Sequence, residues 1–255
     1  MRRNRILSEV EKAKEIRVEE LASICGVSPM TVRRDLQFLS DRGALIRLHG
    51  RAAVREQSEA VPESSRTVQF CRDCISAYAA GLVSDGDALF INGSRTALNL
   101  LKYIRGKKVS VRTNNGYALF DHYGDDIRLH LIGGELHRNV MIGEYVVQNL
   151  LQMSADKTFL GCAAVYDDGE FRYDIPTEIG INEIMISRTR GSLYILADHS
   201  KLKFRKGIAN AYGSFRYNCP VTLLTDDLAD ETIVQHLSEN GIHVIRVPVP
   251  HTAGK

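Results

Sequence analysis

The stretch from Ser28 to Arg34 carries the side chains with the clearest chemical potential in the sequence. Arg33 and Arg34 can bind guanine bidentately or clamp phosphates, Thr31 can reach a phosphate or a thymine methyl, and Met30 can make apolar base contacts. Charged residues on a helix are more often simply solvated. Taken alone, the stretch therefore fits both a nucleic-acid reader and an ordinary helical hairpin.

The residues around this stretch predict two short helices joined by a tight turn. Apolar residues recur at helical spacing from Val18 to Cys25, and Gly26 then ends the first helix. Ser28 occupies an N-cap position and Pro29 the first position of a second helix. The inner face of that helix is apolar and consists of Val32, Leu36 and Leu39. This arrangement is typical of a helix-turn-helix, whose second helix enters the major groove of DNA.

Two short apolar runs then predict a β-wing. Residues 45–48 and 52–54 read as strands around a turn at His49-Gly50-Arg51. Arg47, His49 and Arg51 add groups that are positive or can become so. The N-terminal part is therefore predicted to be a winged helix-turn-helix, with a helix from Asn4 to Lys14 packed behind it.

Composition and charge agree with this division. A chain of 255 residues with 44% hydrophobic and 25% charged residues belongs among globular proteins. Residues 1–57 carry 12 Lys and Arg against 8 Asp and Glu, which leaves the rest of the chain net negative. No apolar run approaches the ~18 residues of a membrane span, and the N-terminus lacks the apolar segment of a signal peptide. We expect a cytoplasmic protein that has no membrane contact.

The remainder predicts a second domain of a different class. Residues 1–56 form the expected DNA-binding domain, residues 57–67 a polar linker, and residues 68–255 a sensor domain. In the last, short apolar runs alternate with helical stretches, which predicts an α/β fold with a mainly parallel sheet covered on both faces. Ligands in such folds bind at the carboxyl ends of the strands.

Small and polar residues follow several of the predicted strands. Residues 92–96, Asn-Gly-Ser-Arg-Thr, form a turn that opens a helix, where backbone N–H groups could hold a phosphate. Each loop could equally be only a turn, a cap or a solvated charge, so their shared position after strands is the stronger argument. The candidate effector-binding residues are Gly93, Ser94, Arg95, Thr96, Asn114, Gly133, Gly134, Lys157, Glu178, Asp198 and Lys201.

The five cysteines do not suggest a disulfide framework, because their number is odd and they are widely spread. Cys71 and Cys74 have C-x-x-C spacing, but no second pair follows and no histidine cluster lies nearby in the sequence. A zinc or redox centre is one interpretation, and two thiols on one side of a helix is the simpler one. We expect neither a metal nor a cofactor.

These motifs closely resemble the DeoR family of bacterial transcriptional regulators. The DNA-binding pattern of that family appears as V-E-E-L-A from Val18, S-P-M-T-V-R-R-D-L from Ser28, and G-A-L-I-R-L-H-G from Gly43. Arg51 stands where the family usually has the second glycine of the wing.

The resemblance continues through the C-terminal domain. Its landmarks include D-G-D from Asp85, G-S-R-T from Gly93, T-N-N from Thr113, A-D-K-T-F-L-G from Ala155 and A-D-H-S-K from Ala197. It implies a fold like ribose-5-phosphate isomerase that binds a phosphorylated sugar. The first loop and Lys201 would hold phosphate, while Asn114, Lys157 and Glu178 would contact the sugar.

Three departures from the family pattern affect the ligand. One is that Cys162-Ala163-Ala164 lacks an acidic residue common in the family after the A-D-K-x-F-x-G strand. Arg95 stands in the phosphate loop, and Asn182-Glu183 replaces a basic pair after Glu178. Positive charge is therefore moved within the pocket, and the ligand is expected to be a sugar phosphate or a different anion.

The sequence thus predicts a transcriptional regulator, a repressor that binds double-stranded operator DNA and responds to a small-molecule effector. A single winged helix presents little basic surface, so a homo-oligomer, dimer or tetramer, is expected. The alternative is a sugar-phosphate isomerase with a DNA-binding appendage, in which Glu178 would act as base and Lys157 or Lys201 would stabilise an enediolate. A third hypothesis is that the winged helix contacts protein instead of DNA.

Overall fold

A computed structural model describes residues 2–41, 45–48, 50–54, 63–121, 123–173, 175–205, 214–217 and 219–250. The chain divides into two compact units, residues 1–64 and 65–255. Each unit has its own hydrophobic core. Within the described residues, no helix combines the length and the apolar character needed to cross a membrane.

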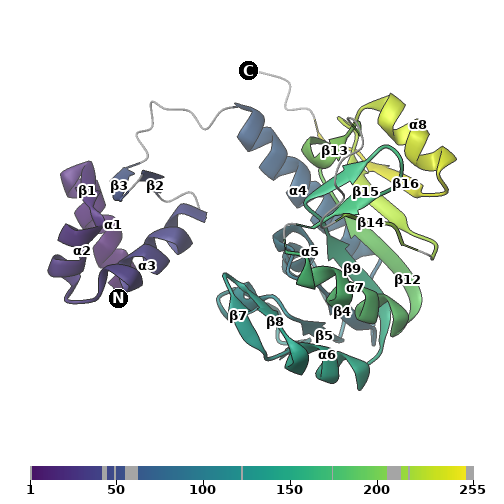
Figure 1. The fold of residues 1–255 in the computed structure, drawn as a ribbon, viewed down its shortest axis with the longest axis horizontal. Coiled ribbons are helices and arrows are strands. Elements are labelled where there is room, and N and C mark those ends of the chain that lie inside the picture. The colour runs from purple at the N-terminus through teal and green to yellow at the C-terminus, as the bar shows by residue number, and fades with distance from the viewer. Residues whose placement is uncertain are drawn as a thin grey trace. The chain divides into compact units, whose positions relative to one another are not determined.

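Unit 1 is a three-helix bundle with a small antiparallel sheet (Figure 1). Its core joins apolar side chains of all three helices, among them Ile6, Leu21 and Leu36, which are fully buried. The elements are α1 (Arg2–Ala13), β1 (Glu15–Arg17), α2 (Val18–Cys25), α3 (Pro29–Asp41), β2 (Leu45–Leu48) and β3 (Arg51–Val54). The predicted helices and wing strands are confirmed to within two residues at the ends that the prediction specified.

Strand β1 was not predicted. It pairs with β3 in the sheet order β1-β3-β2, with Ile16 opposite Ala52. Only Ile16 of its three residues is buried, so the strand is too short to show an alternating pattern in the sequence. Its addition makes the wing part of a three-stranded sheet.

Unit 2 is built on a seven-stranded sheet in the order β16-β15-β12-β9-β4-β5-β6. All six strand pairs are parallel, which confirms the predicted α/β class. The strands are β4 (Ala88–Ile91), β5 (Val109–Thr113), β6 (Ile127–Leu131), β9 (Ala155–Gly161), β12 (Thr189–Leu196), β15 (Thr222–Asp226) and β16 (His243–Val247).

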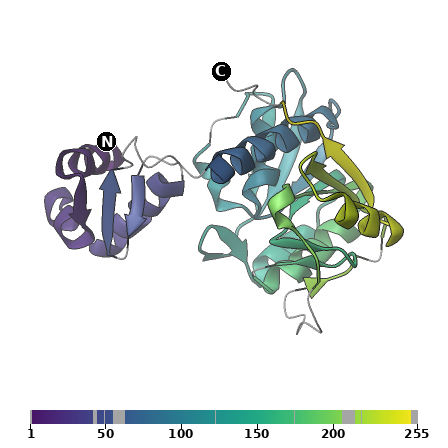
Figure 2. The ribbon, with the colours of Figure 1, turned by 90° about the horizontal axis from the view of Figure 1, so that it is seen from above.

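Helices cover both faces of this sheet (Figures 1 and 2). The strands alternate between two cores: Phe90 of β4 belongs to one, and its neighbours Leu89 and Ile91 belong to the other. Helices α6, α7 and α8 contribute to the first core, and α4 and α5 to the second. The helices are α4 (Glu63–Gly81), α5 (Arg95–Asn99), α6 (Glu144–Leu151), α7 (Thr177–Ser187) and α8 (Glu231–Glu239).

Several elements of unit 2 differ from expectation. Helix α4 begins at Glu63, so it includes residues that the sequence placed in the linker. The apolar spacing predicts helices over residues 97–104 and 117–123, and tight 3-10 turns replace parts of both, at Leu100–Lys102 and Gly116–Leu119. Two small sheets were not predicted: the hairpin of β7 (Glu135–His137) and β8 (Val140–Ile142), and a sheet of β10 (Ala164–Tyr166), β11 (Phe171–Arg172), β13 (Leu202–Lys203) and β14 (Ser214–Phe215). Strands of two or three residues carry too little periodicity to be recognised.

Candidate functional site

The turn between α2 and α3 has the predicted chemistry. Gly26 adopts a left-handed conformation, with φ of 65°, and its N–H bonds back to α2. Ser28 Oγ accepts the backbone N–H of Thr31 at 3.2 Å and lies 3.0 Å from the Thr31 hydroxyl. This N-cap fixes the start of α3, the helix that carries the basic residues.

Within unit 1, the outer face of α3 is exposed to solvent. Met30 is 58% exposed, and Arg33 and Arg34 are exposed as well. Arg33 lies 3.4 Å from the Glu19 carboxylate in an exposed pair, which is weak enough for a phosphate or a base to replace. The outward arginines predicted from the sequence are therefore confirmed in position.

Asp35 anchors the opposite face of α3, a role the sequence analysis missed. Its carboxylate is 2% exposed and accepts hydrogen bonds from Arg2 Nε at 2.6 Å and Arg3 Nε at 2.8 Å. Burial by itself would raise the pKa of Asp35, but the two arginines outweigh it and lower the pKa. The sequence signal for this role was an acidic residue next to Leu36, at a position on the inner face of the helix. The clamp joins α1 to α3 and so fixes the orientation of the basic face.

The wing supplies fewer described contacts. Gly50 has φ of 72° at its tip, and Arg51 at the start of β3 pairs with Glu15 of β1 at 2.8 Å. Arg47 lies in β2, but its side chain and the whole of His49 lie outside the described residues. Arg51, predicted as a DNA contact, is therefore engaged by a carboxylate, although both partners remain nearly half exposed.

In unit 2 the strand order places a topological switch point between β4 and β9. The chain proceeds from β4 to β5 and β6 on one side, and from β9 to β12, β15 and β16 on the other. Loops that follow strands on either side of such a point diverge and leave a crevice at the carboxyl edge of the sheet. Residues 92–96 follow β4, and residues 162–163 follow β9.

Asn92 organises this edge and was not among the predicted site residues. It is buried, its Nδ2 donates to the Gly161 carbonyl at 3.0 Å, and its Oδ1 accepts from the N–H groups of Gly161 and Ser94. Ser94 Oγ caps α5 by accepting from Ala97 N. A Cβ on Gly161 would lie 2.0 Å from Ser94 Oγ, so only glycine allows β9 to approach this loop.

Glu178, Asn114 and the β7–β8 hairpin converge on the same loop. A Cβ on Gly93 would lie 2.6 Å from Val140 of β8 and 2.9 Å from Glu178 Oε1 at the start of α7. Asn114 Nδ2 donates to the Met141 carbonyl in the same hairpin. Gly134 is required for packing, because a Cβ there would lie 2.6 Å from the Ile142 carbonyl oxygen, whereas Gly133 has open space around it. The hairpin thus packs against the loop that follows β4 and against Asn114.

Two buried amide atoms at this edge have no hydrogen-bond partner among the described residues. They are Asn114 Oδ1, an acceptor, and Asn182 Nδ2, a donor on α7. Both side chains are 1% exposed, and Asn182 Oδ1 receives a hydrogen bond from Asn92. Unpaired buried amide groups are uncommon and costly, which makes them candidates for contact with a polar group.

The segment 198–201 completes the edge. Asp198 is fully buried, accepts from Ser200 and lies 2.7 Å from Arg72 Nε of α4. Burial alone would raise the pKa of Asp198, but Ser200 and Arg72 hold it below the usual carboxyl value. Lys201 Nζ donates to the Cys162 carbonyl, directly after β9. Lys201 and Ser94 therefore lie on either side of the end of β9.

Comparison with known proteins identifies the chain. Residues 2–58 match the model of the DeoR-like helix-turn-helix domain, and residues 72–214 match that of the DeoR C terminal sensor domain. The protein belongs to the DeoR family.

Curated relatives of this DeoR protein are transcription regulators. It is 27% identical to the regulator FruR of Bacillus subtilis, over 94% of this chain and 96% of that protein. It is 30% identical to the glycerol-3-phosphate regulon repressor of Haemophilus influenzae, over 79% and 80% of the two chains. Ribose 5 phosphate isomerase A from Neisseria gonorrhoeae matches 54% of this chain and 55% of its own at 14% identity, with a TM-score of 0.39, which is too distant to carry an argument.

The position of Lys157 contradicts its predicted role in this DeoR protein. Lys157 pairs with Leu89 in register and lies near the amino end of β9, where its Nζ is 2.6 Å from Asp87 and 3.0 Å from Ser84. Four residue steps of extended strand, roughly 13 Å, separate it from Gly161 at the carboxyl end. Lys157 therefore does not join the effector candidates, nor can it pair with Glu178 in the isomerase-like arrangement.

Arg95 and Thr96 contribute unequally to the loop. Arg95 is exposed and its guanidinium lies 4.1 Å from the ring centre of Tyr117, a cation–π contact. Thr96 is buried, and its carbonyl accepts a hydrogen bond from Ser76 of α4. The loop is thus tied to α4, while Arg95 remains the positive group at its surface.

Proposed function

We propose that this DeoR-family transcriptional regulator acts in the cytoplasm as a repressor of a carbohydrate-related operon and binds its operator through α3 and the wing. The observation that carries the proposal is the capped helix α3, which exposes Met30, Arg33 and Arg34 while Asp35 anchors its inner face. Names of relatives such as the glycerol-3-phosphate regulon repressor support a role in sugar-related regulation. A dimer or tetramer on repeated half-sites would supply the basic surface that one winged helix lacks.

The effector in this proposal is an anionic, hydroxyl-rich metabolite, with a sugar phosphate as the first candidate. Lys201 and Arg95 supply positive charge at the carboxyl edge, and the unpaired Asn114 Oδ1 and Asn182 Nδ2 offer an acceptor and a donor, the pair of groups that a hydroxyl satisfies. Glu178 beside Gly93 suits further hydroxyl groups. Residues Gly93, Ser94, Arg95, Thr96, Asn114, Gly133, Gly134, Glu178, Asp198 and Lys201 remain the proposed effector set, to which Asn92 and Asn182 are added.

Helix α4 is the proposed route from effector to operator. It is the first helix after the segment that connects the two units, and three of its side chains bond to the effector edge or to α5. Arg72 binds Asp198, Ser76 donates to the Thr96 carbonyl at 2.9 Å, and Asp73 accepts from Asn99 at 2.8 Å. A ligand that moves the 92–96 or 198–201 segment would therefore shift α4. Such a ligand binds one position of α4 more tightly than another, and this difference in affinity is what allostery requires.

The test is retardation of a DNA fragment from upstream of the gene, measured against a random fragment at several salt concentrations. Specific retention that decreases in the presence of one sugar phosphate is the expected result. Thermal-shift screening of sugar phosphates identifies the ligand, because a compound that binds the native state raises Tm. Failure to retain any fragment at low salt would instead favour a protein partner for the winged helix.

Turnover assays address the enzymatic alternative. We expect no isomerisation of pentose or hexose phosphates, because the curated relatives are named transcription regulators and Lys157 lies at the other end of the sheet from Glu178. Lys201 lies at the same edge as Glu178, so turnover is the deciding measurement for the enzymatic alternative. Measurable turnover by the purified protein that Glu178→Gln abolishes would contradict it.

A further inference from the structure

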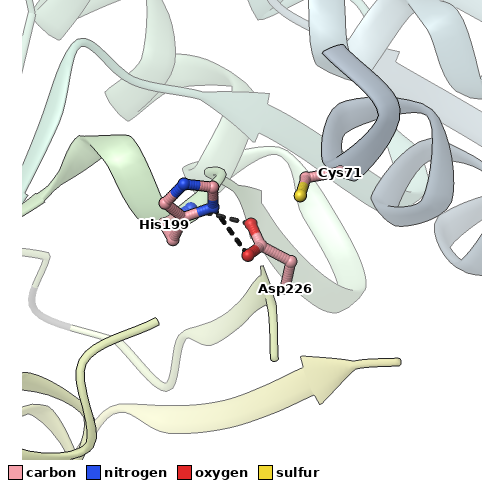
Figure 3. A group of neighbouring side chains, drawn as sticks. All are labelled: Cys71, His199 and Asp226. Carbon is pink, nitrogen blue, oxygen red and sulfur yellow. Dashed lines mark hydrogen bonds and ion pairs between the residues drawn. The ribbon is translucent and has the colours of Figure 1, made fainter. Parts of the chain in front are cut away.

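We propose that Cys71, His199 and Asp226 form a binding site for a borderline-soft divalent cation, with Zn²⁺ as the best fit. One ligand atom of each side chain lies within 4.8 Å of the other two. Figure 3 shows the three side chains pointing toward one another from α4, the 199–201 turn and the end of β15. No histidine lies near Cys71 in the sequence, because His199 follows it more than a hundred positions later.

The fold positions each ligand independently. Cys71 is fully buried on the inner side of α4, and Asp226 is fully buried at the carboxyl end of β15. Asp226 accepts backbone hydrogen bonds from His199 N at 2.8 Å and Leu228 N at 3.2 Å, which orient its carboxylate. His199 follows Asp198, the residue that Arg72 holds. The backbone bonds that orient Asp226 would remain when a cation binds, whereas the hydrogen bond between His199 Nδ1 and Asp226 Oδ1 would be replaced by the metal.

The separation of His199 and Asp226 is close to the one that a tetrahedral ion needs. His199 Nδ1 lies 2.7 Å from Asp226 Oδ1. Around zinc, with ligand bonds of about 2.0 to 2.3 Å, neighbouring ligand atoms lie roughly 3.3 to 3.8 Å apart. The imidazole and carboxylate thus need to separate by only about half an ångström, and the His199 side chain, 25% exposed, gives the site an opening to solvent.

Without a cation, two protons occupy the centre of this group. A carboxylate only accepts, so His199 donates its Nδ1 proton to Asp226, and the buried Cys71 side chain is a thiol that carries the second proton. On binding, the cation takes the Nδ1 lone pair, the imidazole keeps its proton at Nε2, and the thiol releases one proton. The charge of Cys71, His199 and Asp226 then changes from −1 to zero with the cation included.

The donor set selects the class of metal. A thiolate and an imidazole favour Zn²⁺ or Co²⁺ over Mg²⁺ or Ca²⁺, which prefer oxygen ligands. Three protein ligands leave a fourth position for water. A bound cation would fasten α4 to the 198–201 turn, the same two elements that the Arg72 to Asp198 ion pair joins.

The experiment is titration of the full-length, tag-free, EDTA-treated protein with Co²⁺. We expect one equivalent to produce the near-ultraviolet sulfur-to-cobalt charge-transfer band and the intense visible bands of four-coordinate cobalt, both removed by one equivalent of Zn²⁺. The variant Cys71→Ser should lose the charge-transfer band, and His199→Asn should bind Co²⁺ at least tenfold more weakly.

Cys74→Ser is the matched control, because Cys74 lies one turn along the same helix and is not in the cation group. It should retain both sets of bands. Circular dichroism and thermal melts establish that each variant is folded, and His199→Asn provides an independent reading if Cys71→Ser does not fold. Absence of the sulfur band in the wild type, or its persistence in folded Cys71→Ser, would overturn the proposal.

Discussion

Each unit of the protein contains a buried aspartate held by arginine from an earlier helix, and the two differ in what surrounds them. Asp35 is bound by two neighbouring arginines of α1 inside a small bundle, where it supports the reading helix. Asp198 is bound by one arginine of α4, and it begins the turn that carries Lys201. The first clamp is a fixed support, whereas the second joins two elements at a proposed ligand site. The same ion-pair chemistry can therefore hold one surface rigid and link another to a proposed ligand site.

The largest effect is expected from breaking the second clamp. Arg72→Leu removes the cationic partner of a carboxylate that is fully buried, which should lower the free energy of unfolding of unit 2 by about 2 kcal/mol, less than for a wholly buried pair because Arg72 is one-third exposed. Urea denaturation measures this loss. Arg66→Leu, at an exposed position of the same helix, is the control and should leave stability nearly unchanged.

The reading surface is the next test. Arg34→Ala should weaken specific operator binding by about 1 to 3 kcal/mol if Arg34 contacts a base, and should weaken specific and random DNA equally if it contacts only phosphate. Gel retardation of both fragments at one salt concentration separates the two outcomes. Equal affinity of wild type and variant for the operator would remove Arg34 from the interface.

The first clamp should act through stability. Asp35→Asn should destabilise unit 1 by about 1 to 2 kcal/mol, since both arginines can turn to solvent. The pKa of Asp35 is lowered in the folded state, so its contribution is present above the carboxyl pKa of the unfolded chain, about 4, and is lost as pH falls through the folded-state pKa. Denaturation at pH 7 and below pH 4 should show a smaller pH dependence in Asp35→Asn than in the wild type.

The smallest effects are expected from substitution of two lysines of the sensor unit, which should differ in their influence on the effector response. Lys201→Ala should leave operator affinity nearly unchanged and weaken the response to effector, because Lys201 lies at the carboxyl edge. Lys157→Ala should leave that response intact and cost less than about 1 kcal/mol of stability from its pair with Asp87. Effector titrations of the DNA complex measure both, and a response lost only in Lys157→Ala would reverse the assignment of the two ends.

Much of unit 1 could be predicted because its signals are local. Gly26, Ser28 and Pro29 define the turn and the start of α3 within four residues, and the apolar spacing that follows fixes which side of α3 is outward. The Asp35 clamp could not be predicted, because its arginines lie more than thirty positions away and an inward aspartate has no meaning without α1 beside it.

In unit 2 the alternation of strands and helices, and with it the parallel sheet, follows from local sequence patterns. Which strands are neighbours depends on packing and cannot be seen in local patterns. Packing places the loop after β4 beside the end of β9, and it places Cys71 near His199 and Asp226. Lys157 and Gly161 belong to the same short motif, yet they lie near opposite ends of β9. The reason is that an extended strand places its first and last residues at opposite edges of the sheet. Local patterns fix the type of an element, whereas only packing fixes which ends meet.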